Sequence, residues 1–445
     1  MKPTHIGCTV ARFCRLILIA STSTGIAITN TVQASGFAVP EISVAGLGTA
    51  NALVANADDP GAFAFNPAAM VFHDRNSIAA GGLFIGPDFS VRTANGRQES
   101  QGADWLVAPM MQAAIKLNDH WWAGLGINAP FGLETRWATG TFEPLTFTTT
   151  LPNGAEIPIS PQPTQSKLET IDIVPTLSYR VNDQWSLSAG ADIYWLKSAQ
   201  LNSSLTDLSG DGTGWGFNLS TLYQQGPWSL GANFHSAATV KVTGKFRPLN
   251  QNLAALYIQS GGLMGLPPAQ SAELDLNLPW RLQLGARYKL TPKLAVEFDW
   301  TRMGWSEFDR IQVESRDTGQ VLLEDRNQWQ DASAYRLGVT FKLTPETLLR
   351  FGYAYDENAQ PDDYFSARVP DNDRQLFSLG VSQQLSDTWR IDAGYTFVMF
   401  EDRDFDGVRP YNPYQAPADI NGTTAIAGEY QSQAHLIGIE VSMSF

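Results

Sequence analysis

The chain has 445 residues and a formal net charge of −14 at pH 7, which argues against the basic face that nucleic-acid binding requires. Hydrophobic residues make up 43% of the chain and aromatic residues 11%, yet after the N-terminal segment no run of about 18 apolar residues occurs. A bundle of membrane-spanning helices is therefore excluded. If the mature chain lies in a membrane it must be a closed barrel, because only helices and closed barrels satisfy their backbone groups in lipid.

The N-terminus predicts a secretory signal peptide over residues 1–34. Basic residues flank a short apolar run that begins at Leu16, and a small-residue cleavage site follows, ending at Ala34. The alternative, a membrane anchor, is disfavoured because the run is shorter than the roughly 20 residues that a spanning helix needs. Both cysteines, Cys8 and Cys14, lie inside the signal, so the mature chain has no disulfide, Cys-ligated metal or cysteine nucleophile.

The remainder of the chain shows strand periodicity. In 437–445 every odd position is apolar and every even position is small or polar, a period-two pattern that ends on Phe445. A terminal aromatic residue in this phase resembles the signal by which outer-membrane barrels are recognised for assembly. The alternation recurs in 185–195 and 280–288 with Trp or Tyr at the ends of the apolar face, as the aromatic girdles of membrane barrels require.

The alternating segments predict an all-β fold, a transmembrane antiparallel β-barrel over residues 76–445. About fourteen strands are expected, an even number as in single-chain barrels: 76–92, 104–117, 120–130, 167–181, 184–198, 213–225, 227–243, 273–290, 293–316, 320–343, 346–356, 371–385, 388–402 and 429–445. Short turns alternate with longer polar loops, the asymmetry expected between the periplasmic and outer ends. The longer loops are expected at 93–103, 131–166, 199–212, 244–272, 357–370 and 403–428.

Residues 35–75 have no strand pattern and are rich in Gly, Ala and Asn. A barrel of this width has a lumen that side chains alone do not fill, so the segment is expected to form a hatch inside it. The alternative is a disordered periplasmic tail. Four phenylalanines, at 37, 63, 65 and 72, disfavour the tail because disordered segments are poor in aromatic residues.

Several segments, including 46–50 and 57–59, together resemble the FadL family of outer-membrane long-chain fatty acid and hydrocarbon transporters. Ser35-Gly36-Phe37 and Asn66-Pro67-Ala68 resemble the family's hatch, and Leu278-Pro279-Trp280, 305–308 and 370–374 resemble its recurrent barrel segments. The resemblance covers essentially the whole mature chain. It implies a fourteen-stranded barrel closed by the hatch, in agreement with the strand count.

The resemblance also implies a route for an apolar ligand. The ligand enters a groove among the outer loops, moves into a pocket against the hatch, and leaves sideways where the third strand kinks inward. For the groove, the 244–272 loop is unusually apolar, and exposed apolar patches generally mark binding surfaces; the alternative is a self-packed loop helix. The candidate groove residues are Leu256, Ile258, Leu263 and Met264. The chain departs from the family at 199–212, which looks too short to face this loop.

Candidates for the later steps come from the hatch and the kink. Phe37 is carried over as a ligand-binding residue, and Asn66, Pro67 and Ala68 as hatch residues. For the kink, proline cannot donate to a ladder and glycine weakens one; the candidates are Pro130, Phe131 and Gly132. The alternative is that the strand merely ends there.

Arg336 and Arg374 fall on the lumen-facing phase and are candidates for a ligand carboxylate, which requires a cation or donors. Charged residues at such positions also commonly stabilise the water-filled interior of a barrel, and acidic residues of this chain occupy lumen-facing positions too. The alkyl chain of such a ligand contributes roughly 0.8 kcal/mol of binding free energy for each methylene that is buried.

The predicted function is passive uptake of long-chain fatty acids or other hydrophobic molecules across the Gram-negative outer membrane. The alternative is a general diffusion porin, which would lack a hatch. An enzyme is not expected, since no Ser/His/Asp spacing or His-rich metal set stands out, and no cofactor or metal is expected. Expected partners are the ligand, outer-membrane lipid and lipopolysaccharide, and the barrel assembly machinery, with no nucleic acid; the chain is expected to be a monomer.

Overall fold

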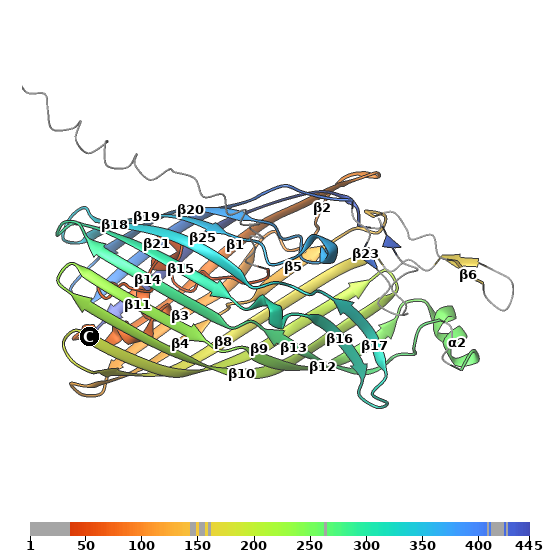
Figure 1. Ribbon diagram of the computed structural model, residues 1–445, viewed down its shortest axis with the longest axis horizontal. Helices are drawn as coiled ribbons and strands as arrows, with labels where there is room; N and C mark the ends of the chain where they lie inside the picture. Colours follow the sequence, from red (N-terminus) through yellow and green to blue (C-terminus); the bar gives the residue numbers. More distant parts are fainter. Residues whose placement is uncertain are drawn as a thin grey trace, which may run out of the picture. The chain divides into compact units, whose positions relative to one another are not determined.

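The sheet closes on itself through its first and last strands. In the computed structural model, β1 (Ser77–Thr93) pairs antiparallel with β3 (Leu106–Lys116) on one side and with the C-terminal β25 (Gly428–Ser444) on the other. The result is a closed antiparallel barrel of fourteen strands (Figure 1). The structure describes residues 36–142, 148–150, 156–158, 162–261, 265–406, 409–410, 422–423 and 426–445, and the predicted signal peptide lies outside them.

All fourteen expected strand segments are confirmed. Besides β1, β3 and β25, the uninterrupted barrel strands are β8 (Pro163–Arg180), β9 (Trp185–Ser203), β10 (Thr206–Gln225), β19 (Thr347–Asp356), β20 (Arg374–Gln384) and β21 (Trp389–Phe400). The other barrel strands are each broken into two pieces: β4 (Trp121–Asn128) and β5 (Gly132–Arg136), β11 (Trp228–His235) and β12 (Ala238–Pro248), β13 (Gln270–Leu278) and β14 (Arg281–Lys289), β15 (Leu294–Met303) and β16 (Arg310–Ser315), β17 (Val321–Arg326) and β18 (Ala332–Lys342).

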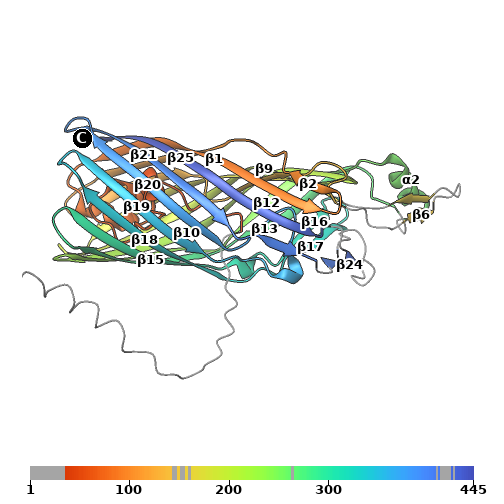
Figure 2. The same ribbon diagram turned by 90° about the horizontal axis from the view of Figure 1, so that it is seen from above.

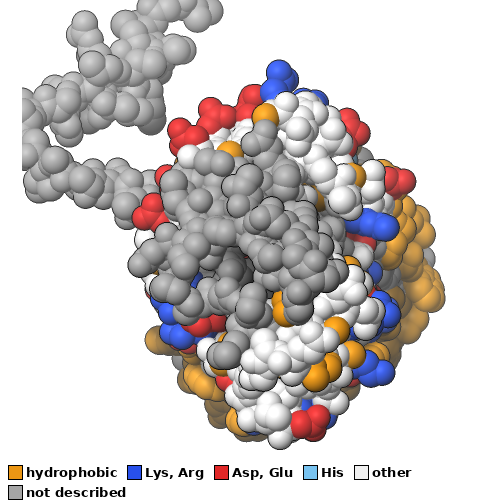
Figure 3. Space-filling model, turned by 90° about the vertical axis from the view of Figure 1, so that its right-hand side faces the viewer, with side chains coloured by type: hydrophobic (Ala, Val, Ile, Leu, Met, Phe, Trp, Pro, Cys, Tyr) orange, Lys and Arg blue, Asp and Glu red, His pale blue; other side chains and the backbone are white. Residues whose placement is uncertain are grey.

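The two ends of the barrel differ as expected. Tight turns join the strands at the end that carries the C-terminus, whereas α2 (Gln251–Gln259) and the short strands β2 (Gly96–Glu99) and β6 (Thr148–Thr150) project from the other end (Figures 1 and 2). That end also carries β7 (Glu156–Pro158), β22 (Arg403–Phe405), β23 (Arg409–Pro410), β24 (Gly422–Thr423) and η4 (Asp362–Tyr364), whereas η3 (Trp305–Glu307) lies in the break between β15 and β16. Acidic and basic side chains are interspersed on this face (Figure 3).

The prediction of a loop at 199–212 is wrong. β9 continues to Ser203 and β10 begins at Thr206, so the two strands form one long hairpin that extends the wall. Its outward positions include Asp207 and Asp211, which carry charge instead of apolar side chains. The strand signal was lost because the apolar alternation stops where the outer face is polar.

Side chains alternate between lipid and lumen along each strand. On β9, Trp185 is 47% exposed, whereas Ser186 is fully buried inside the barrel. The exposed apolar face with aromatic ends is the outward face predicted from the alternation. No helix among the described residues is long and apolar enough to cross a membrane.

The hatch, residues 36–75, is built from short capped turns. Its elements are α1 (Val44–Leu47), η1 (Pro60–Ala64) and η2 (Pro67–Phe72), whose N-caps Ser43, Asp59 and Asn66 each accept a backbone amide with the side chain. Most of its residues are buried against the inner wall, with α1 packed on β20 and β21 and η2 on β8, β9 and β10. Glycines allow this close approach: a Cβ at Gly352 would collide with the backbone of Thr49.

Candidate functional site

The N-terminal part of the hatch, residues 36–42, is called the arm here, and it ends in an aromatic cage. The ring centroid of Phe37 lies 4.8 Å from that of Trp305, 5.2 Å from Phe308, 5.7 Å from Trp329 and 5.9 Å from Phe131. Only 5% of Phe37 is exposed. Edge-to-face contacts of this kind add to the free energy gained by burial of the ring.

Gly36 fixes how the arm enters the cage. Its φ is +53°, and a Cβ at this position would collide with the rings of Trp305 and Trp329. Only glycine meets both the backbone and the steric requirement. The Gly36 amide donates to Asp371 Oδ2 over 2.8 Å, which holds the arm beside the cage.

The arm is hydrogen-bonded to the broken third strand. The Val39 amide donates to the Pro130 carbonyl over 2.8 Å, and the Gly132 amide donates to the Phe37 carbonyl over 3.0 Å. β4 ends before Pro130 and β5 begins after it, as the proline and glycine predicted. Because these groups pair with the arm, the arm bridges the kink.

The same break opens the wall on the side of β3. β3 pairs with β4 only from Met111 to Lys116, and among the described residues no pairing joins β3 to β5. A cavity of about 400 Å³, called the exit cavity here, lies between the arm, β3 and the kink. Its lining includes Trp105 and Val107, which are 52% and 66% exposed on the barrel's outer face.

A second cavity of about 120 Å³, called the lumen cavity here, lies on the other side of Phe37. Its lining includes leucine, valine and isoleucine side chains from β8, β10, β12, β13 and β16. Phe37 belongs to the lining of both cavities. The ring therefore separates an apolar chamber inside the barrel from a cavity that reaches the barrel's outer face.

The sequence of the chain matches the family model described as outer membrane protein transport protein (OMPP1/FadL/TodX) over residues 25–445. The chain belongs to this family. The resemblance drawn from the sequence is confirmed, and the chain is an outer-membrane transport barrel. It is 25% identical to the long-chain fatty acid transport protein of Escherichia coli O6:H1, covering 94% of this chain and 96% of that protein.

Other relatives and solved structures agree with the family. Outer membrane protein P1 of Haemophilus influenzae is 24% identical, covering 93% of this chain and 96% of that protein. A Pseudomonas aeruginosa FadL homologue has the same fold, with a TM-score of 0.75 and 21% identity over 92% of this chain and 99% of that chain. The Pseudomonas putida toluene transporter TodX gives a TM-score of 0.62 and 17% identity over 93% of this chain and 98% of that chain.

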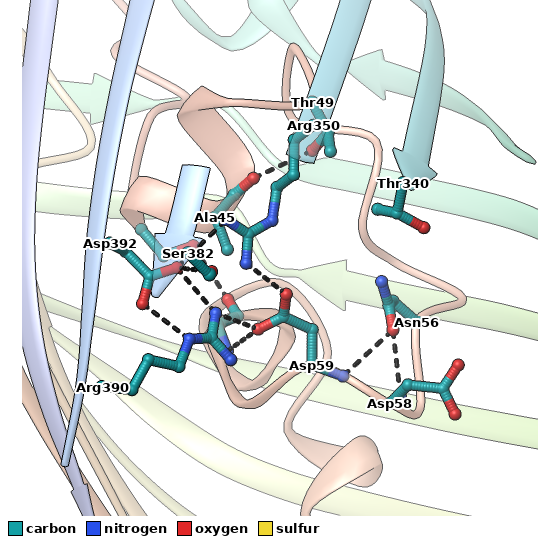
Figure 4. Close-up of polar contacts among 12 residues, drawn as sticks. Ala45, Thr49, Asn56, Asp58, Asp59, Thr340, Arg350, Ser382, Arg390 and Asp392 are labelled. Atoms are coloured by element: carbon teal, nitrogen blue, oxygen red, sulfur yellow. Dashed lines mark hydrogen bonds and ion pairs between the residues drawn. The ribbon is translucent and has the colours of Figure 1, made fainter. Parts of the chain in front are cut away.

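The base of the hatch is held by buried ion pairs in this family member. Asp59 pairs with Arg350 over 2.6 Å and with Arg390 over 2.9 Å, and both arginines also contact Asp392 (Figure 4). Burial alone would raise the pKa of Asp59, but Arg350 and Arg390 outweigh it and hold the pKa well below its ordinary value. The neighbouring Asp58 pairs with Arg287 and Lys289 of β14.

The Asn66-Pro67-Ala68 turn is a further anchor. The Asn66 amide group donates to the carbonyls of Val54 and Thr221, so it ties two parts of the hatch to β10. Ser178 and Ser186 donate to the carbonyls of Pro67 and Ala68. These contacts place the turn in the fixed part of the hatch, away from the arm.

The two candidate arginines form ion pairs within the chain. Arg336 lies 3.1 Å from Asp356 and also contacts Thr301, whereas Arg374 lies 3.4 Å from Asp356 and lines the exit cavity. A ligand carboxylate would have to compete with these carboxylates. Both arginines remain predictions as ligand-binding residues.

The groove candidates lie on or after α2. Leu256 is 5% exposed, so it packs beneath the helix, whereas Ile258 is 67% exposed. Leu263 and Met264 lie outside the described residues.

Sequence reasoning missed four residues of the site, Trp305, Phe308, Trp329 and Asp371. The resemblance included 305–308 and 370–374 without assigning either segment to the arm. The signal for Asp371 was its place in an acidic loop segment after a proline; Trp329 lies between β17 and β18 with no periodic pattern. Within the described ranges, no group of three or more His, Cys, Asp or Glu side chains could hold a metal ion.

Proposed function

We propose that this chain mediates passive uptake of long-chain fatty acids or related hydrophobic molecules across the outer membrane. Family membership supports transport, and the names of relatives support these ligands, since they include a long-chain fatty acid transport protein and a toluene transporter. Burial of alkyl chain in an apolar cavity drives ligand entry at roughly 0.8 kcal/mol per methylene.

The proposed route has three stages. The ligand first meets apolar side chains such as Ile258 on the outer loops and then enters the lumen cavity. It next displaces the arm from the aromatic cage, so that Phe37 no longer separates the two cavities. It then passes through the exit cavity and leaves between β3 and β5 into the membrane.

The observation that carries this proposal is the shared position of the arm. Phe37 lines both cavities, and the backbone on either side of it pairs with Pro130 and Gly132 of the kink. Movement of the arm therefore joins the cavities and removes the hydrogen bonds that bridge the break in the wall. A single displacement accomplishes both steps.

A reversible cross-link tests the route. Ala38 and Phe131 are bridged partners across the arm and the kink, and opposed positions of this kind bring Cβ atoms within reach of a disulfide. Oxidation of the double variant Ala38→Cys/Phe131→Cys is expected to remove at least ~90% of labelled palmitate uptake. The reason is that a disulfide of ~2 Å holds the arm against the kink. Uptake is expected to return with reductant, up to the level of Phe131→Cys alone.

The reduced double variant and the oxidised Phe131→Cys variant are the matched controls, since the predicted mature chain has no other cysteine. Full uptake by the oxidised double variant, with the disulfide confirmed by mass spectrometry, would refute the proposed route.

A further inference from the structure

The exit cavity carries more acid than base. Its ionisable lining residues are Glu41, Glu134, Lys167, Glu169, Asp371 and Arg374, four carboxylates against two cations. Both cations are already engaged: Lys167 lies 3.4 Å from Glu134 and 3.7 Å from Glu169, and Arg374 pairs with Asp356 of β19. A carboxylate anion that entered this cavity would meet like charges in a partly desolvated space.

Asp371, one of the lining residues, has a carboxylate oxygen without a hydrogen-bond partner among the described residues. It is 3% exposed, and its Oδ2 accepts the Gly36 amide. Its Oδ1 is buried and has no hydrogen-bond partner among the described residues. A buried acceptor without a partner is costly, and a carboxylate oxygen can accept strong hydrogen bonds from O–H donors.

The electrostatic surroundings leave Asp371 able to act as an acceptor near neutral pH. Burial raises the pKa of Asp371 to about 6, against the lowering effects of Arg374, the nearby Gly36 amide, Arg403 and the Asn372 amide. Burial likewise raises the pKa of Glu41, the other enclosed carboxyl of this lining.

We propose that Oδ1 of Asp371 accepts a hydrogen bond from the hydroxyl head group of an uncharged amphiphile as it occupies the exit cavity. The ligand class is a fatty alcohol or a fatty acid in its protonated form, with the alkyl chain against the apolar lining. This inference rests on the proposed function. It assigns Asp371 a role in ligand specificity in addition to its contact with the arm.

Equilibrium binding of three ligands with matched chains tests the inference. Radiolabelled 1-hexadecanol, methyl palmitate and palmitate at pH 7.5 are bound to the full mature protein in nanodiscs, with empty nanodiscs subtracted. The wild type is expected to bind hexadecanol about tenfold more tightly than methyl palmitate, which has no hydrogen-bond donor. The difference in affinity between hexadecanol and palmitate is expected to be larger.

The variant Asp371→Asn replaces a charged acceptor with a neutral amide. Its carbonyl can still accept the Gly36 amide, so the arm keeps its contact, while the NH2 group turns a donor toward the cavity. The affinity for palmitate relative to hexadecanol is expected to rise by at least about tenfold. The matched control is Asp363→Asn, an exposed carboxylate of the same loop, which should leave the ratio unchanged.

Folding of each variant is checked by the heat-dependent shift in gel mobility that closed barrels show. Equal affinities for the three ligands in the wild type would overturn the inference while leaving the proposed function intact. An unchanged ratio in folded Asp371→Asn would overturn it as well. Binding of none of the ligands above empty nanodiscs would overturn the proposed function too.

Discussion

Replacement of Phe37 by alanine is expected to release the arm while leaving the rest of the hatch in place. The ring is 5% exposed and contacts four aromatic side chains, and truncating a buried Phe to Ala costs about 3–5 kcal/mol. Near the ring, the backbone of the arm is also held by the hydrogen bonds of Gly36, Val39 and Gly132, worth about 1 kcal/mol each. A loss of about 3 kcal/mol shifts the docking equilibrium ~100-fold toward the released arm.

Hydrogen exchange measured by mass spectrometry reports this shift. The amides of Val39 and Gly132 should exchange ~100-fold faster in Phe37→Ala if exchange follows arm release, while peptides from residues 51–72 should keep their wild-type rates. Phe72→Ala is the control, because Phe72 packs in the base of the hatch and outside the cage. Wild-type exchange of both amides in folded Phe37→Ala would refute the view that the cage holds the arm.

Further outcomes follow from the charges and the outer loops. Planar-bilayer recordings should show no large steady conductance, whereas a diffusion porin would conduct freely. Ile258→Glu should lower labelled palmitate uptake at limiting ligand concentration several-fold, because it places charge on an exposed apolar surface, with Asn252→Glu as the control. Arg336→Gln should lower the melting temperature with little change in ligand affinity, since Arg336 pairs with Asp356. Asp59→Asn should cost about 3–5 kcal/mol of stability at pH 7 by leaving Arg350 and Arg390 uncompensated. Because the folded-state pKa of Asp59 is depressed, its contribution is present above pH ~4 and is lost as pH falls further, so thermal melts of variant and wild type should converge in acid.

The barrel was predictable because membrane strands obey a strict physical rule. Lipid on one side and a wet lumen on the other impose the alternation at 185–195 and 280–288, and these segments lie in β9 and β14 as expected. The rule fails where the wall rises above the lipid. There the outward positions of β9 and β10 are polar, so the 199–212 segment was mistaken for a loop.

The site was only partly predictable, because its residues come from separate parts of the chain. Phe37 and the Pro130–Gly132 kink follow from local chemistry and the family resemblance. Their pairing is set by the path of the arm through the lumen, which no local pattern encodes. Trp329 and Asp371 join the site from the other side of the barrel for the same reason.

The contacts divide the hatch into two parts with different freedom to move. Residues from Leu47 to Phe72 are tied to β8, β10, β19 and β21 by buried ion pairs and side-chain hydrogen bonds, and loss of any one leaves a buried charge or polar group without a partner. The outer part of the arm, residues 36–39, is instead held by one aromatic ring and a few hydrogen bonds of its backbone. A hydrophobic ligand replaces the burial that Phe37 supplies, and among the described residues no ion pair involves 36–39. Displacement of the arm is therefore less costly than displacement of the whole hatch, which favours lateral exit through the kink over passage toward the periplasm.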